Sequence, residues 1–378
     1  MAVLTEEQTI LKDQAQAWVR EEAPVARFRQ MRDSGAEIGF EVDTWRKIVE
    51  LGWSGIIVPE AYGGSGMDCR TFGVVLEELG RGLTASPLFA SCLVGASALL
   101  AGNNEDAKRS WLPRIVSGEA IVTLAVDEGP HHNPAGISLK ATRTGDGFGL
   151  TGEKAFVLDG FAADAFVVAA RTGGEAGDEA GISLFVVPGD AQGISRRRLS
   201  VTDSRGYADL TFDNVVVGMD ALISAEGDGF AMLDAVLDRA RAGLAAEMLG
   251  TGAECFDRTL EYLKTRVQFG QVIGSFQSLG HRAATHFMEM ELARSCVEGA
   301  LKAIDEEEGD AQILASLAKC QVGEFVHDMS NDMIQMHGGI GMTDEFDAGL
   351  FLKRARTTAT TFGNQAFHRS RYISHFGI

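Results

Sequence analysis

The stretch TRVQFGQVIGSFQ, residues 265–277, joins two long segments whose apolar side chains recur at helical spacing. Gly270 and Gly274 permit a tight connection between two helices. Arg266 offers a planar fork of donors suited to a phosphate, and Phe269 offers a flat apolar surface. The stretch therefore predicts a helix hairpin. Its tip is a phosphate-binding element or, alternatively, an ordinary link with a surface arginine.

A second glycine-rich stretch, QMHGGIGMTDE at 335–345, follows later in the chain and ends a helix at His337. Three glycines within residues 338–341 are more than a helix cap needs, and they let a ligand approach the backbone closely. Alone, the stretch is also explained by a glycine cap and a loop. Long helices with short links predict an antiparallel four-helix bundle over residues 219–378. The expected helices are 230–266, 276–307, 311–337 and 345–360.

The chain before the bundle changes character near residue 120. Residues 1–120 show helical periodicity, whereas residues 121–218 alternate short apolar runs with Gly, Asp and Pro. Short strands at this spacing predict a small antiparallel barrel or sandwich. We therefore expect an α+β multidomain protein: a helical domain at 1–120, a middle β domain at 121–218 and a bundle at 219–378. The expected strands are 121–126, 139–144, 154–158, 165–170, 182–187 and 209–217.

The composition limits which binding partners and which cellular compartment we expect. The formal net charge is −19 and no long Lys/Arg run occurs, so we expect no nucleic-acid partner. No apolar run approaches the ~20 residues of a membrane span, and the N-terminus shows no secretory signal. Five cysteines without C-x-x-C spacing indicate a reducing cytoplasm. His131 and His132 lack a third ligand at useful spacing, so we expect no metal there and a solvated loop.

The two glycine-containing stretches are specific when taken together. The element R-x-x-F-G…F-Q at 266–277, followed by Q-x-H-G-G-x-G at 335–341, strongly resembles the acyl-CoA dehydrogenase family. The resemblance covers essentially the whole chain and includes the three-part order and residues 58–66 and 147–160. It implies FAD bound between subunits of a dimer or tetramer, an acyl-CoA substrate and electron-transfer flavoprotein as acceptor. The implied reaction, in fatty acid or steroid catabolism, removes the acyl α-proton while a hydride passes from the β-carbon to flavin N5.

Six residues match family positions that hold the adenine and pyrophosphate end of FAD in a neighbouring subunit. They are Arg266, Phe269, Gln277, Gln335, Gly338 and Gly339. A charge-assisted contact of Arg266 with the pyrophosphate contributes about 1.5–3 kcal/mol. The resemblance further implies that Arg241 lies near CoA and the catalytic base. A helix-surface arginine is the alternative for Arg241.

Two departures concern this chain's own flavin. Where the family has T-E-P-x-A-G-S-D, residues 127–133 read DEGPHHN and lack the serine that helps to anchor ligand phosphates. Where the family has G-x-K-x-W-I-T-N-G, Phe156 keeps the aromatic residue that covers the flavin. Leu158, however, replaces the threonine whose hydroxyl contacts it, so one hydrogen-bond donor is lost.

A third departure concerns the catalytic base. The two positions at which the family places its glutamate hold Phe362 and Ala240, and neither side chain can take a proton. Glu247 lies seven residues after Ala240, about 10 Å along the same helical face. Asp127 lies near the expected flavin edge. Glu247 and Asp127 are thus candidate bases, although a bundle ion pair and a loop carboxylate explain them as well.

The positions that serve a neighbour's flavin are kept, and those that serve this chain's own flavin and substrate are altered. This pattern resembles the base-lacking subunit of heteromeric family members that act on steroid side-chain or dicarboxylyl CoA thioesters. The leading hypothesis is an FAD-dependent acyl-CoA dehydrogenase subunit that completes the FAD site of a partner. The alternatives are a self-sufficient homo-oligomeric dehydrogenase with a relocated base, a non-catalytic binding protein, and an oxidase or monooxygenase on the same fold.

Overall fold

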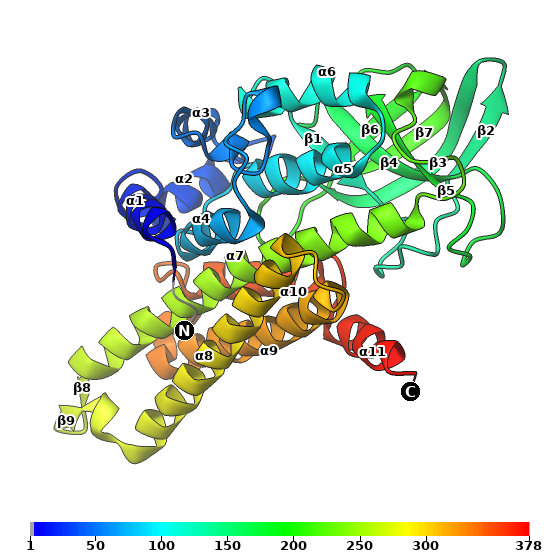
Figure 1. The fold of residues 1–378 in the computed structure, drawn as a ribbon. Helices are drawn as coiled ribbons and strands as arrows, with labels where there is room; N and C mark the ends of the chain where they lie inside the picture. The colour runs from blue at the N-terminus through cyan, green and yellow to red at the C-terminus, as the bar shows by residue number, and fades with distance from the viewer. Residues whose placement is uncertain (1–3, 378) are drawn as a thin grey trace. The chain divides into compact units, whose positions relative to one another are not determined.

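The computed structural model describes residues 4–377 and divides them into two compact units. The first unit contains the chain up to Arg29, the segment Gly73–Thr84 and the chain from Arg241 onward. The second unit contains Gln30–Phe72 and Ala85–Ala240. Figure 1 shows the order of helices, strands and long helices along the chain. The predicted α+β class, with a helical N-terminal part, a middle β domain and a C-terminal bundle, is confirmed, while its domain boundaries stay a prediction.

Short helices with recognisable ends form the N-terminal third. The Thr5 hydroxyl accepts a hydrogen bond from the Gln8 amide at 3.1 Å, and the Gln8 side chain accepts one from the Thr5 amide at 3.1 Å. Pro24 separates the first two helices, because proline disfavours helical backbone in the residue before it. The helices are α1 (Glu6–Glu22), α2 (Val25–Ser34), α3 (Val42–Glu50), α4 (Cys69–Arg81), α5 (Ala96–Ala101) and α6 (Glu105–Val116).

One seven-stranded sheet forms the middle of the chain, in the order β1-β4-β2-β3-β7-β6, with β5 paired to β4. The structure differs from the predicted small antiparallel barrel or sandwich in one respect, because β1 and β2 both run parallel to β4. β4 is buried along its whole length, as expected for a central strand with both faces covered. The strands are β1 (Val122–Ala125), β2 (Lys140–Thr144), β3 (Gly147–Leu158), β4 (Ala165–Arg171), β5 (Ile182–Pro188), β6 (Ile194–Arg198) and β7 (Tyr207–Gly218).

Long helices follow the sheet, and a short hairpin connects the first two of them (Figure 1). A further helix, α11, begins where the Asn364 side chain accepts a hydrogen bond from the Phe367 amide at 2.9 Å. No helix in the described part of the chain has the length and apolar character needed to cross a bilayer. The elements are α7 (Phe230–Thr265), β8 (Val267–Gln268), β9 (Gln271–Val272), α8 (Gln277–Asp305), α9 (Ala311–His337), α10 (Ala348–Thr360) and α11 (Gln365–His375).

Candidate functional site

The hairpin between α7 and α8 presents an aromatic ring to solvent. Its strands pair through Val267 with Val272, and its two-residue turn consists of Phe269 and Gly270 with φ of 55° and 79°. Positive φ at both turn residues matches the twist of a two-residue hairpin, but it is strained for a phenylalanine. The Phe269 side chain is 91% exposed, and its ring meets the Phe276 ring edge-on at 6.1 Å. Strained, exposed residues of this kind are typical of binding sites.

The C-terminal end of α9 presents open backbone. His337 is buried, with its Nδ1 2.7 Å from the Met333 carbonyl oxygen and its ring stacked on Tyr262 at 4.2 Å. Burial lowers the pKa of His337. Gly338 then adopts φ 64° and ψ −137°, a conformation that favours glycine. A Cβ atom on Gly338 or Gly339 would meet no atom within 4 Å, so the backbone there is open to a ligand.

A small apolar cluster brings the two glycine-containing stretches to one end of the bundle. Leu263 of α7, Ile273 before α8 and Met336 of α9 form its buried centre, and Tyr262 and Phe276 pack against it. The residues that flank this cluster are exposed and include a guanidinium, a flat ring and glycine backbone, which fit an anionic dinucleotide such as FAD. The six positions predicted to bind FAD all lie at this end: Arg266, Phe269, Gln277, Gln335, Gly338 and Gly339.

The segment after α10 holds the first base position and is bound by a buried arginine. Phe362 has φ 55°, and Gly363 has φ 108°. Arg241 is 0% exposed, and its Nε donates to the Phe362 carbonyl oxygen at 3.4 Å. Its guanidinium carbon lies 5.4 Å from the centre of the Phe367 ring. Arg241 is therefore an interior residue that contacts the base position, and the alternative of a helix-surface arginine is wrong.

Sequence reasoning missed a lysine beneath the same segment. The Lys319 side chain is buried, and its Nζ donates to the carbonyl oxygens of Thr358 at 2.8 Å, Ala359 at 3.3 Å and Gly363 at 3.3 Å. Burial, assisted by the positive charge of Arg241, lowers the pKa of Lys319 to about 7. A charged residue inside the apolar stripe of α9 was the signal available in the sequence.

The candidate base Glu247 is buried on α7 and forms an ion pair. Its Oε1 lies 3.3 Å from Nη1 of Arg354, which is also buried. The other guanidinium nitrogen of Arg354 donates to the Leu83 carbonyl oxygen at 3.3 Å. The carboxylate thus neutralises a buried cation. Ala240, the second base position, is buried and directly precedes Arg241 on the same helix.

The loop after β1 is organised around Glu128 and a buried lysine. Glu128 Oε1 accepts from Lys154 Nζ at 2.7 Å and from the Leu139 amide at 3.0 Å. Its Oε2 accepts from the Ser138 amide at 2.8 Å and hydroxyl at 2.5 Å. Lys154 also donates to the Val126 carbonyl oxygen at 2.9 Å. Burial alone would raise the pKa of Glu128, but Lys154 and these hydrogen bonds outweigh it and lower the pKa.

Asp127, the other candidate base, pairs with a histidine in this loop. The Nδ1 of His132 lies 2.9 and 3.0 Å from the two carboxylate oxygens of Asp127. The His132 side chain is 2% exposed, whereas His131 is exposed. The expectation of a solvated loop is therefore wrong for His132. Among residues 4–377, no group of three His, Cys, Asp or Glu side chains is placed to hold a metal ion.

The last two family positions lie at the end of β3. Phe156 has φ 52° and is half-exposed, and its amide donates to Asp209 Oδ1 at 3.1 Å. The Leu158 side chain is buried, and its carbonyl oxygen accepts from the Thr123 hydroxyl at 2.8 Å. The aromatic residue is thus presented to solvent, and no hydroxyl stands at the neighbouring position.

Three family models match consecutive parts of the chain. The N-terminal domain of acyl-CoA dehydrogenases matches residues 5–119, the middle domain residues 127–215 and the C-terminal domain residues 227–375. An acyl-CoA dehydrogenase of Bacillus subtilis (strain 168) is 30% identical over 382 residues, which is 98% of this chain and 98% of the relative.

Two solved structures are similar over nearly their whole length. A glutaryl-coenzyme A dehydrogenase in complex with glutaryl-CoA is 27% identical with a TM-score of 0.91, covering 100% of this chain and 97% of the other. A structure described as "Tcur3481-Tcur3483 steroid ACAD" is 29% identical with a TM-score of 0.89, covering 98% of each chain.

Proposed function

Because the chain belongs to the acyl-CoA dehydrogenase family, we propose that it is the base-lacking subunit of a heteromeric member. The family reaction is the FAD-dependent α,β-dehydrogenation of an acyl-CoA thioester, and the chain is an oxidoreductase of this class. FAD supplies the hydride acceptor when it is bound. In this proposal the exposed end of the bundle, with Arg266 and Gly338, binds the adenine and pyrophosphate end of the flavin that a partner subunit uses.

The observation that carries the proposal is the contrast between two sets of positions. The six FAD positions at the end of the bundle keep the family residue types and are exposed. The two base positions, Phe362 and Ala240, hold side chains that cannot accept a proton. Glu247 forms an ion pair with the buried Arg354, and Asp127 contacts His132. Both carboxylates therefore already have partners and are not positioned to abstract a substrate proton. The partner therefore supplies the base.

The similarity to a steroid enzyme whose name joins two proteins supports an assembly of two related chains. We propose an acyl-CoA substrate with a bulky group such as a steroid side chain, electron-transfer flavoprotein as electron acceptor, a dimeric or tetrameric assembly and a cytoplasmic location.

Co-expression tests the proposal most directly. The full chain is produced alone and together with a second acyl-CoA dehydrogenase-like chain that carries the base glutamate. We expect the pair to co-purify with FAD and to oxidise an acyl-CoA, whereas the chain alone does not. Stoichiometric FAD and turnover by the chain alone would contradict the subunit role. A stable pair without flavin would favour the non-catalytic binding protein, and oxygen consumption would identify an oxidase or monooxygenase.

Replacing Arg266 with Met tests the cofactor contact. A charge-assisted hydrogen bond contributes about 1.5–3 kcal/mol, so we expect FAD to bind the complex about 10- to 100-fold more weakly. The measurement is the dissociation constant of FAD, followed by flavin fluorescence, together with the flavin retained on dilution. Lys264→Met is the matched control, because Lys264 is an exposed cation on the same helix end and pairs with Glu261. Equal FAD affinity in both variants would show that Arg266 does not contact the cofactor.

A self-sufficient dehydrogenase with a relocated base is the second candidate, and the Asp127–His132 pair is the observation that favours it. An aspartate that orients a histidine is a common arrangement in acid–base catalysis. This candidate requires turnover by the chain alone and its loss in Asp127→Asn or Glu247→Gln. Full rates in both variants would exclude these two residues as the base.

A further inference from the structure

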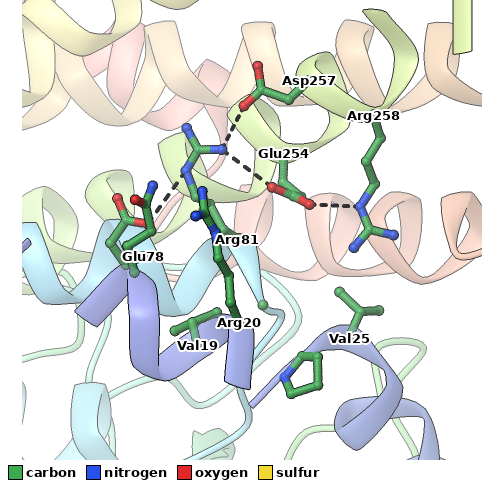
Figure 2. Close-up of a pocket in the computed structure, with 11 residues that line it drawn as sticks. Val19, Arg20, Val25, Glu78, Arg81, Glu254, Asp257 and Arg258 are labelled. Atoms are coloured by element: carbon green, nitrogen blue, oxygen red, sulfur yellow. Dashed lines mark hydrogen bonds and ion pairs between the residues drawn. The ribbon is translucent and has the colours of Figure 1, made fainter. Parts of the chain in front are cut away.

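A cavity of about 410 Å³ lies in the first unit and is lined by none of the residues assigned to FAD or to the base. Figure 2 shows the side chains around it. Three parts of the chain line it: the second half of α1 with the start of α2, the end of α4, and the middle of α7. Its volume is within the range of small-ligand sites.

The cavity has an apolar side. Val19 and Val25 are buried, and they line it together with Pro24 and the backbone of Gly82. These residues surround the junction where α1 ends and α2 begins. A ligand that buries only charged atoms would leave this side without a partner, so the cavity suits a ligand with an alkyl part.

The cavity is also lined by arginines whose carboxylate partners are shared. Arg81 Nη1 lies 2.9 Å from Asp257 and 3.4 Å from Glu254 (Figure 2). Glu254 also accepts from Arg258 Nε at 2.8 Å. The Nε of Arg81 has no hydrogen-bond partner within the described residues and lies 3.7 Å from the carboxylate of Glu78. One buried donor on this wall is therefore without a hydrogen-bond acceptor among the described residues.

Arg20 supplies further donors. It lines the cavity from α1, as Arg81 does from α4 (Figure 2). In the part of the chain that the structure describes, its guanidinium forms no ion pair and no side-chain hydrogen bond. Glu78, whose carboxylate lies 3.7 Å from the Nε of Arg81, is 1% exposed, and burial raises its pKa. Arg20 thus has donors that no side chain of the described residues takes up, which favours binding of an added negative charge.

We propose that this cavity binds a small organic carboxylate, held by Arg20 and the Nε of Arg81, with its short alkyl part against Val19, Pro24 and Val25. The guanidinium fork matches the two oxygens of a carboxylate, and the apolar side takes the chain. The proposal goes beyond the dehydrogenase function, because it uses none of the residues assigned to FAD or to the base. Binding there would join α1, α4 and α7 and stabilise the first unit.

The test is a titration of the full chain with acetate, butyrate and hexanoate, each against sodium chloride at the same ionic strength. Isothermal calorimetry gives the affinity and thermal unfolding gives the stabilisation. Each buried methylene should tighten binding about fourfold until the apolar side is filled. Inorganic phosphate, which has no alkyl part, should bind more weakly than butyrate. Affinity that is independent of chain length, phosphate binding as tight as butyrate, or no saturation at millimolar concentration would each overturn the proposal.

A pair of variants links the binding to the cavity. Arg20→Met should weaken butyrate binding about tenfold or more, since a charge-assisted hydrogen bond is lost. Arg27→Met is the matched control, because Arg27 is an exposed arginine on the neighbouring helix and does not line the cavity. Unchanged binding in Arg20→Met, or an equal loss in Arg27→Met, would place the ligand elsewhere. The titration needs neither FAD nor a partner subunit, so its failure leaves the proposed function standing.

Discussion

Two segments that depart from the family pattern are each organised by a buried lysine, but the lysines are neutralised differently. Lys154 in the β unit donates to a carboxylate, Glu128, at 2.7 Å. Lys319 in the bundle donates to three backbone carbonyl oxygens and shares its surroundings with Arg241. Burial lowers the pKa of both amines. The carboxylate of Glu128 opposes this effect at Lys154, whereas the side chain of Cys320 opposes it at Lys319.

The two lysines therefore differ in their partners: Lys154 forms an ion pair, whereas Lys319 donates to backbone carbonyl groups. The loop at 127–133 depends on an ion pair, so removing one partner leaves an uncompensated charge. The segment around Phe362 depends on three carbonyl groups, which bind an ammonium fully and a neutral amine only in part, because the neutral amine has two N–H donors. The first segment should therefore respond to mutation, and the second to pH.

The largest effect is expected from Glu128→Gln. The change leaves Lys154, which is fully buried, without its counter-charge, and breaking such a pair costs about 3–5 kcal/mol. Urea unfolding should show this loss in the free energy of unfolding. Glu153→Gln is the control, because Glu153 is exposed on the same strand as Lys154; this change should alter the free energy of unfolding by less than about 0.5 kcal/mol.

The double variant Glu128→Gln with Lys154→Met sharpens the same comparison. If the charge pair is the cause, removing both partners should recover part of the lost stability. A loss in Glu128→Gln no larger than in Glu153→Gln would show that the amide and hydroxyl donors, and not Lys154, hold the loop.

Lys319→Met should remove a pH dependence of stability. In the folded chain the pKa of Lys319 is about 7, against an ordinary value of 10.5, so between these values the unfolded chain binds a proton that the folded chain does not. Stability of the wild type should therefore rise with pH in this window, by up to about 1.4 kcal/mol per pH unit, and the penalty is complete below pH 7.

Denaturant unfolding of wild type and Lys319→Met at several pH values measures this difference. The free energy of unfolding of the wild type minus that of Lys319→Met should increase steadily as pH rises above 7. A constant gap would mean that Lys319 stays in one protonation state, and the carbonyl groups would then hold the ammonium as firmly as a carboxylate does.

The smallest effect is expected from the two adjacent histidines. His132→Ala removes the contact with Asp127 and should cost about 0.5–1.5 kcal/mol, whereas His131→Ala, which changes an exposed side chain, should cost almost nothing. Thermal unfolding compares the two variants. Equal costs would show that Asp127 does not depend on His132, and the loop would then rest on Glu128 alone.

Much of the fold was predictable because its signals are local. The apolar periodicity of residues 311–337 predicts both ends of α9, which runs from Ala311 to His337 as expected. β6 was missed because Ile194–Arg198 is an exposed edge strand whose arginines carry no apolar alternation. The helix α11 was missed because its start depends on a single cap, Asn364, after a glycine. Local periodicity cannot detect elements that neighbours or caps define.

The sequence by itself determined the family, the order of a helical, a β and a second helical part, and the two glycine-containing stretches. Each of these depends on residue type and spacing along the chain. Only the tertiary structure decided what surrounds the altered positions: Lys319 and Arg241 at Phe362, Lys154 at Glu128, and His132 at Asp127. The physical reason is that a pKa or an ion pair depends on burial and on groups distant in sequence, which no local pattern records.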